Sequence, residues 1–285
     1  MFSYRHAFHA GNHADVLKHL VLVQLLRYFA QKDSPYWYID THAGAGAYAL
    51  DGDWAGKTAE FESGIARLWT RDDLPAIVAD YVEEIVAFNQ DEFLRYYPGS
   101  PFLAARAMRD RDRLRLFELH PTEIEVLRSN FRGQGKDEAR RTMIYAADGF
   151  EGLKALLPPP TRRGIVLIDP SYEDKRDYAR VVECLGEALK RFATGCYAVW
   201  YPQVSRRESQ QLAGRLARVP ARSWLHVTLT VRKPSSDGLG LHGSGMFIVN
   251  PPWVLEAALK DAMPWLTRVL AQDAAAAFSL DGRQA

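Results

Sequence analysis

The chain has 285 residues, of which 47% are hydrophobic and 25% charged, and its formal net charge is +1. This length suits one large domain with an insertion or two small domains, and the composition is ordinary for a soluble globular protein. No segment approaches the ~18 apolar residues of a membrane span, and the N-terminus lacks the apolar core of a signal peptide, so we expect a cytoplasmic protein without a membrane partner. Cys184 and Cys196 have no metal-ligand spacing and indicate no disulfide scaffold.

The first predicted element is a helix from Asn12 to about Gln31. Its apolar residues follow helical spacing from Val16 to Leu25, and Asn12 is a suitable N-cap. After Ser34-Pro35, a short apolar run enters the glycine-rich segment Asp40–Gly46, as in a strand followed by a βα turn.

Residues 51–97 have a different pattern. Ile77, Tyr81, Ile85 and Phe88 are helically spaced, and no strand-like alternation occurs among these residues. We therefore predict an inserted helical subdomain at 51–97, a main domain made of 1–50 and 98–271, and a flexible tail at 272–285.

From residue 114 onward, apolar strands alternate with helical segments, which predicts an α/β fold with a parallel sheet covered by helices on both faces. Residues 232–245 leave no room for a helix before the last strand, so that strand is expected to pair antiparallel. The candidate strands, seven in all, are Tyr36–Ile39, Leu114–Glu118, Thr142–Tyr145, Ile165–Ile168, Tyr197–Trp200, Trp224–Val231 and Met246–Val249.

Ligands of open α/β sheets bind beyond the carboxyl ends of the strands, and acidic residues gather there in this sequence. The glycines of the first turn, Gly44 and Gly46, match only part of the dinucleotide fingerprint, because Ala49 occupies the third glycine position, and on their own they fit a structural turn equally well. Glu118, Asp148 and Asp169 follow three later strands. This set suits an adenosine-containing cofactor, whose ribose hydroxyls need an acidic acceptor.

The segment Asp169–Tyr172 suggests methylation of an adenine amine. The N6 lone pair is delocalised into the ring, so a site must accept both N–H bonds and hold the nitrogen in line with the methyl donor. The Asp169 carboxylate and the Pro170 carbonyl are suitable acceptors, and Tyr172 is expected to offer a face to a flipped-out base. The alternative is a buried strand ending in an ordinary turn. A second acceptor-Pro-Pro-aromatic segment, Asn250–Trp253, follows the last strand, which is expected to end at the opposite edge of the sheet.

Six stretches together resemble the RlmJ (YhiR) family of bacterial 23S ribosomal RNA adenine-N6 methyltransferases, from Ser3 to about Trp265. They are SYRHAFHAGNHADVLKH, DTHAGAG, YYPGSP, FELHP, ADGF and IDPSYE. The resemblance implies a class I, Rossmann-like methyltransferase fold that uses S-adenosylmethionine. It also implies a catalytic role for Asp169 and an RNA contact for Tyr4. The cofactor-binding residues it implies are His19, His42, Ser100, Glu118, Asp148 and Gly149, to which we add Lys18 and Gly44. Ser171 stands where the second proline of the family's Asp-Pro-Pro-Tyr motif is usual.

Other functions remain open at this point. His9 and His13 are spaced i, i+4, but no glutamate or cysteine accompanies them as in known zinc motifs, so no metal is expected. A DNA or tRNA adenine-N6 methyltransferase would share the same chemistry. An NAD-dependent dehydrogenase or a non-catalytic RNA-binding module is a more distant alternative. Basic pairs in loops, such as Arg206-Arg207 and Arg232-Lys233, are candidate phosphate contacts. We expect a monomer that binds 23S ribosomal RNA.

Overall fold

The computed structural model describes residues 9–50, 59–90, 93–238 and 240–284, and its central helix is α1 (His13–Ala30). The Asn12 side chain accepts hydrogen bonds from the backbone N–H groups of Ala14 and Asp15, which confirms the predicted N-cap. The helix is buried on most sides over its first three turns, and not along a single stripe, because the sheet covers one side of it and other helices cover the rest.

The main sheet has eight strands in the order β10-β8-β9-β7-β6-β1-β4-β5. Strands β1, β4, β5, β6 and β7 pair in parallel, whereas β9 is antiparallel to both β7 and β8, as expected for the last predicted strand. All seven predicted strands are present. The strands are β1 (Trp37–Asp40), β4 (Arg113–Phe117), β5 (Thr142–Tyr145), β6 (Gly164–Ile168), β7 (Cys196–Gln203), β8 (Trp224–Thr230), β9 (Gly243–Val249) and β10 (Ala277–Arg283).

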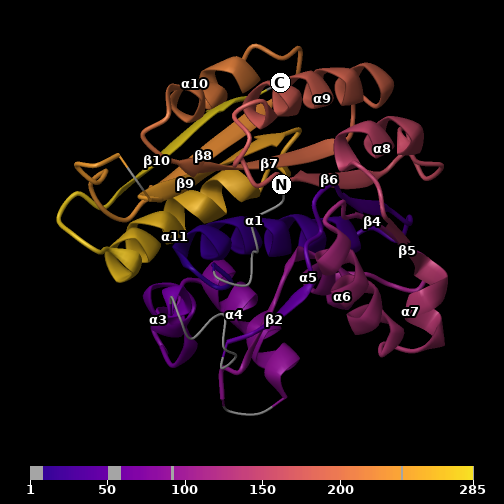
Figure 1. Ribbon diagram of the computed structural model, residues 1–285, viewed down its shortest axis with the longest axis horizontal. Coiled ribbons are helices and arrows are strands. Elements are labelled where there is room, and N and C mark those ends of the chain that lie inside the picture. Colours follow the sequence, from indigo (N-terminus) through magenta and orange to yellow (C-terminus); the bar gives the residue numbers. More distant parts are fainter. Residues whose placement is uncertain (1–8, 51–58, 91–92, 239, 285) are drawn as a thin grey trace.

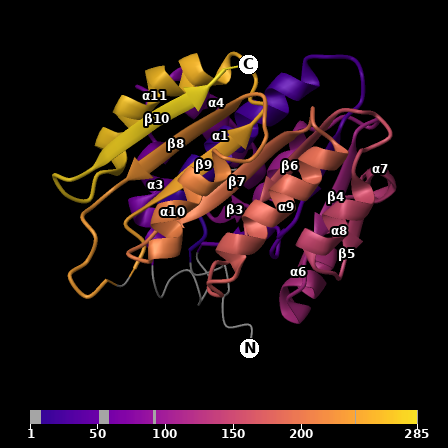
Figure 2. The same cartoon turned by 90° about the horizontal axis from the view of Figure 1, so that it is seen from above.

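Helices cover both faces of the sheet (Figures 1 and 2). One hydrophobic core lies beneath α1, α5 (Ser100–Ala107), α6 (Pro121–Arg132) and α11 (Leu255–Leu270), and the other beneath α8 (Gly149–Leu156), α9 (Asp177–Arg191) and α10 (Arg207–Leu216). The short α7 (Lys136–Arg141) precedes β5. Successive strand residues alternate between the two cores, which explains why the central strands read as continuous apolar runs.

The main sheet has one strand more than the seven predicted, because part of the expected flexible tail forms β10. This strand pairs antiparallel with β8, and the hydroxyls of Thr228 and Ser279 lie 2.6 Å apart across the pair. Leu280 packs against the core beside α11. This pairing provides hydrogen-bond partners for the backbone groups that β8 would otherwise expose at the edge of the sheet. The tail sequence is only weakly apolar, so its side chains do not indicate a strand.

The region predicted to be an insertion contains three short or medium helices in its described residues. It begins and ends at a two-stranded antiparallel ladder of β2 (Ala47–Ala49) and β3 (Tyr96–Pro98), which encloses η2 (Glu60–Ser63), α3 (Ala66–Trp69) and α4 (Ala76–Asn89). The apolar face of α4 packs against α1 and α11, and its side chains belong to the same core as those helices. The inserted helices are therefore packed onto the main domain.

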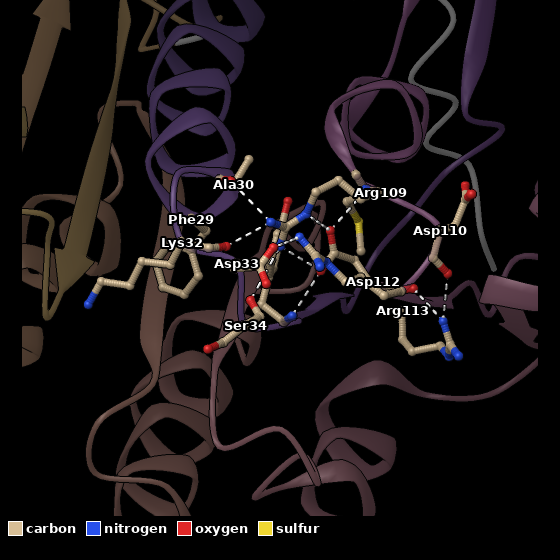
Figure 3. A network of polar contacts seen from close by, with 12 residues as sticks. Phe29, Ala30, Lys32, Asp33, Ser34, Arg109, Asp110, Asp112 and Arg113 are labelled. Atoms are coloured by element: carbon tan, nitrogen blue, oxygen red, sulfur yellow. Dashed lines mark hydrogen bonds and ion pairs between the residues drawn. The ribbon is translucent and has the colours of Figure 1, made fainter.

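A polar network joins the segment after α1 to the turn before β4 (Figure 3). The buried carboxylate of Asp112 accepts hydrogen bonds from the backbone N–H of Tyr36, at 3.0 Å, and from the guanidinium of Arg109, at 2.9 and 3.0 Å. Arg109 also donates to the carbonyls of Ala30 and Lys32. The basic residues before β4 alternate with acids, a pattern typical of a solvated surface. Arg109 nevertheless has a structural role, because it holds these two segments together.

Both cysteines are buried with free thiols. Burial raises the pKa of the Cys184 and Cys196 thiols to about 12. In the described part of the chain, no helix combines the length and apolar character needed to cross a membrane.

Candidate active site

The carboxyl ends of β1, β4, β5 and β6 meet at one edge of the sheet. The backbone N–H of Thr41 donates to the carbonyl of Leu167 at 3.1 Å, and that of Ala43 donates to the carbonyl of Phe117 at 2.8 Å. The chain thus leaves β1 between its two neighbouring strands. The acidic residues predicted to gather at this edge follow these strands.

The glycine turn after β1 is held by Glu118. Gly44 and Gly46 have φ angles of 60° and 83°, in the left-handed region that favours glycine. The Gly44 N–H donates to Glu118 Oε2 at 2.8 Å, and the His120 N–H donates to Oε1 at 2.6 Å. Burial raises the pKa of Glu118, although these hydrogen bonds oppose the shift. The carboxylate remains partly exposed, and each of its oxygens has a further lone pair to offer a ligand.

Asp148 and Gly149 begin α8 beside this turn. Asp148 Oδ1 accepts from the N–H of Phe150 at 2.9 Å, and Oδ2 pairs with Arg180 at 2.5 Å. A Cβ atom on Gly149 would lie 2.0 Å from the carbonyl oxygen of Thr41, so only glycine lets the helix approach the turn this closely. The His42 ring lies edge-on to Phe150, with centroids 4.8 Å apart.

Asp40, which the sequence analysis did not single out, lies at the centre of this edge. It is fully buried, and its Oδ2 accepts hydrogen bonds from Ser100 Oγ at 2.7 Å and from the Tyr38 hydroxyl at 2.8 Å. Burial raises the pKa of Asp40 to about 6. Its position directly before the glycine turn is the same signal that identified Glu118 and Asp169.

Two of the predicted cofactor residues are buried behind this edge. Ser100 is engaged by Asp40, and His19 Nδ1 lies 2.7 Å from the hydroxyl of Tyr97. Tyr97 in turn contacts the hydroxyl of Tyr81 on α4 at 2.9 Å. In this structure these side chains support the site from within the fold.

Asp169 follows β6 and is anchored by α1. Lys18 Nζ lies 2.7 Å from Asp169 Oδ2 and 2.8 Å from Asp15 Oδ1, and the Lys18 side chain is only 5% exposed. Burial alone lowers the pKa of Lys18, but the two carboxylates outweigh burial and hold it above its usual range. Asp15 was not predicted as a site residue, although an acid one helical turn before Lys18 is a visible signal in the sequence. The Asp169 side chain is 14% exposed, so it remains accessible from outside.

The structure corrects the expectation for Tyr172. Its side chain is 2% exposed, packs 4.6 Å from the ring of Tyr178, and donates its hydroxyl to the carbonyl of Trp200 at 2.7 Å. Tyr172 has a φ of 55°, which turns the chain and directs the ring into the core. It therefore offers no exposed face to a base. Pro170 is buried, and within the described chain no donor binds its carbonyl oxygen.

The second acceptor-Pro-Pro-aromatic segment lies at the opposite edge of the sheet, as predicted. The Asn250 side chain donates to the carbonyls of Ala193 and Gly195, which precede β7. It follows the antiparallel β9 and is therefore far from the ends of β1, β4 and β6.

Two further expectations concern RNA and metal. Tyr4, the predicted RNA contact, lies outside the described residues. His9, the first histidine of the i, i+4 pair, lies with its Nδ1 3.0 Å from Glu60 Oε1. No group of three or more His, Cys, Asp or Glu side chains in the described ranges is arranged to hold a metal ion.

Comparison with known proteins places this chain in a family. Residues 33–281 match the model described as "Ribosomal RNA large subunit methyltransferase D, RlmJ". The chain belongs to the RlmJ family of ribosomal RNA methyltransferases. It is 49% identical to ribosomal RNA large subunit methyltransferase J of Escherichia coli over 93% of each chain. It is 44% identical to the Haemophilus influenzae protein of the same name, over 99% of this chain and 98% of the relative.

A solved structure shares this fold. Protein LPL1258 from Legionella pneumophila superposes with a TM-score of 0.86 at 35% identity, covering 96% of this chain and 98% of its own. Membership in a methyltransferase family favours methyl transfer over the dehydrogenase and the non-catalytic RNA-binding module considered above.

The residues at the sheet edge fit S-adenosylmethionine, the methyl donor expected for an RlmJ-family enzyme. The glycine turn leaves Gly44 partly exposed beside the Glu118 carboxylate, which suits a ribose diol. The approach of Gly149 to Thr41 brings the start of α8 to the same turn. His42 and Asp148 are partly exposed next to it. This set combines an acidic acceptor, backbone groups and a neutral ring, and such groups suit an adenosine moiety.

Proposed function

We propose that this chain methylates the N6 amine of an adenine in 23S ribosomal RNA, with Asp169 and the Pro170 carbonyl holding the amine. The observation that carries the proposal is the Asp169 carboxylate, which Lys18 fixes at the same sheet edge as the glycine turn and Glu118. When bound, S-adenosylmethionine supplies the electrophilic methyl group.

The two acceptors are well suited to an aromatic amine. Lys18 binds Asp169 Oδ2, and within the described chain no donor binds Oδ1, so this oxygen is available to one N6–H. The Pro170 carbonyl, which no donor in the described chain binds, would accept the other. With both N–H groups engaged, the nitrogen is directed at the donor and water is excluded from it. Transfer would exchange the methyl–sulfur bond of the donor for the N6–methyl bond, with the electron pair left on the sulfur, and the proton that N6 then loses would pass to Asp169 or to solvent.

Each cofactor residue has a proposed role. Glu118 would accept hydrogen bonds from the ribose hydroxyls, while Gly44 and Gly149 let the backbone approach the cofactor. His42 and Asp148 would contact the nucleoside. Ser100 and His19 would position Asp40 and the floor of the site from behind.

We further propose that the protein acts as a monomer in the cytoplasm, with Tyr4 contacting the RNA. The residues gathered at the site all come from one chain, so the geometry requires no second copy. Light scattering of the purified protein, with and without RNA, would test the oligomeric state.

The test is transfer of a labelled methyl group from S-adenosylmethionine to unmodified 23S ribosomal RNA, with DNA and tRNA as alternative substrates. Wild type, Asp169→Ala and Asn250→Ala would be compared. We expect labelled N6-methyladenine in ribosomal RNA alone, and activity lost only in Asp169→Ala. Labelling of DNA or tRNA instead, or loss of activity only in Asn250→Ala, would refute the proposal.

A further inference from the structure

The burial of Tyr172 leaves the target base without the aromatic surface that was predicted from the sequence. An extruded base is normally held by stacking, because unstacking it from the nucleic acid costs a few kcal/mol. A base held at Asp169 would therefore need another ring nearby. The following inference rests on the proposed function and deepens it.

Strand register places Trp200 next to Asp169. Ile168, the last residue of β6, pairs with Val199 in β7, so Asp169 and Trp200 are the next residues of the two neighbouring strands. Side chains alternate along a strand, and both Leu167 and Ala198 face the core beneath α1. The side chains of Asp169 and Trp200 therefore lie on the same face of the sheet, towards α1.

The contacts of Lys18 confirm this placement. Its Nζ lies 2.7 Å from Asp169 Oδ2 and 5.5 Å from the centre of the Trp200 ring. The indole thus lies beside the acceptor carboxylate. The Trp200 side chain is partly exposed, unlike that of Tyr172.

Tyr172 supports Trp200 from behind. The two ring centres are 6.1 Å apart, and the Tyr172 hydroxyl donates to the Trp200 carbonyl. The indole Nε1 is buried and has no hydrogen-bond partner within the described part of the chain. The indole N–H of Trp200 therefore makes no hydrogen bond that would explain a tryptophan at this position. What the side chain offers is the face of its ring.

We propose that Trp200 is the substrate-positioning residue against whose ring the flipped adenine stacks while Asp169 holds its amine. The substrate class is a single extruded purine of RNA. Base–aromatic stacking of the usual strength corresponds to a roughly tenfold to hundredfold loss of kcat/KM for RNA when the ring is removed.

The test compares Trp200→Leu, which removes the ring, with Trp200→Phe, which keeps an aromatic face. Trp253→Leu is the matched control, since Trp253 is 81% exposed and lies at the opposite edge of the sheet. Steady-state methyl transfer to unmodified 23S ribosomal RNA and calorimetric binding of S-adenosylmethionine would be measured for each. We expect the loss in Trp200→Leu alone, substantial rescue in Trp200→Phe, and unchanged cofactor affinity in all three variants.

A second measurement uses the wild-type protein, in case Trp200→Leu fails to fold. The methylated adenine would be mapped by mass spectrometry and replaced in a short RNA by photoreactive 8-azidoadenosine. Crosslinking to the peptide that contains Trp200 supports the proposal. Crosslinking to a peptide elsewhere, or full RNA kinetics in a folded Trp200→Leu variant, overturns it. If wild type transfers no methyl group to RNA, the proposed function itself fails, which is a distinguishable result.

Discussion

Asp40 and His42 lie two residues apart, and burial shifts their pKa values in opposite directions. The pKa of Asp40 rises to about 6 and that of His42 falls to about 4, because burial disfavours the charged form of each side chain. Both groups are therefore held neutral near the glycine turn over part of the acidic range. Asp40 and His42 therefore make opposing contributions to the pH dependence of the free energy of unfolding.

We predict that Asp40→Asn makes stability rise more steeply with pH. Between about pH 4 and 6 the folded protein holds a proton on Asp40 that the unfolded chain has lost, so this group lowers the free energy of unfolding as pH rises, by about 3 kcal/mol over the window. His42 contributes with the opposite sign, because its folded pKa is lowered. Removing Asp40 leaves that gain uncompensated. Denaturant unfolding of both proteins at pH 4, 5 and 6 measures the difference, and parallel curves would contradict the prediction.

Gly149→Ala should damage the cofactor site. The added methyl group would lie 2.0 Å from the Thr41 carbonyl oxygen, so α8 must move away from the glycine turn. We expect at least a tenfold weaker binding of S-adenosylmethionine, measured by calorimetry, together with a lower melting temperature. Gly186→Ala in α9 is the control, because nothing lies within 4 Å of its Cβ position and alanine favours a helix. Equal affinities in the two variants would show that the close approach is not needed.

For individual residues, the sequence predicted which side chains gather at the carboxyl ends of the strands, but not how deeply each side chain is buried. Glu118, Asp148 and Asp169 could be predicted, because the carboxyl ends of parallel strands must meet. The burial of Tyr172 depends on Tyr178 and Trp200, and no local pattern around residue 172 reports those contacts.

Among the elements, α1 joins the insertion to the candidate site, because it is capped by Asn12 and carries Lys18. The cap side chain accepts two backbone hydrogen bonds and also donates to Glu60 Oε2 at 2.9 Å, which ties the helix start to the insertion. The helix was predicted correctly from its apolar spacing and its cap. Its burial on nearly all sides was not, since that depends on helices far away in the chain.

Asn12→Ala should lower the free energy of unfolding by about 1–2 kcal/mol, because it leaves the N–H groups of Ala14 and Asp15 without their acceptor. Chemical denaturation measures this change. The exposed Lys32, just after the helix, provides a control, and Lys32→Ala should change stability little. A stability loss in Asn12→Ala no larger than in the control would mean that the cap is dispensable.

In the whole molecule, the two ends of the parallel strands carry different features. The site gathers at the carboxyl ends of the parallel strands, while the Asp112 network ties the chain together before β1 and β4 (Figure 3). The sequence predicted this parallel architecture from its alternating elements. It missed β10, because pairing at an open sheet edge depends on backbone need more than on side-chain pattern.

Asp112→Ala should therefore reduce stability and leave chemistry intact. Removing the buried carboxylate leaves Arg109 without its ion-pair partner and the Tyr36 N–H without its acceptor, at a cost of about 3 kcal/mol. Turnover at saturating substrates, at a temperature where the variant is folded, should match wild type. Asp110→Ala, which removes an exposed carboxylate nearby, is the control. A large fall in turnover would mean that the two ends of the strands are coupled.

The two buried thiols have a practical consequence for observing this enzyme at work. With pKa values of about 12, Cys184 and Cys196 hold almost no thiolate at neutral pH, so they should resist alkylation and oxidation. A cysteine introduced at the exposed Ser171, beside Asp169, would then be the preferred target for a maleimide dye. A single fluorophore at that point would report, in real time, the arrival and departure of RNA without any need to remove the native cysteines.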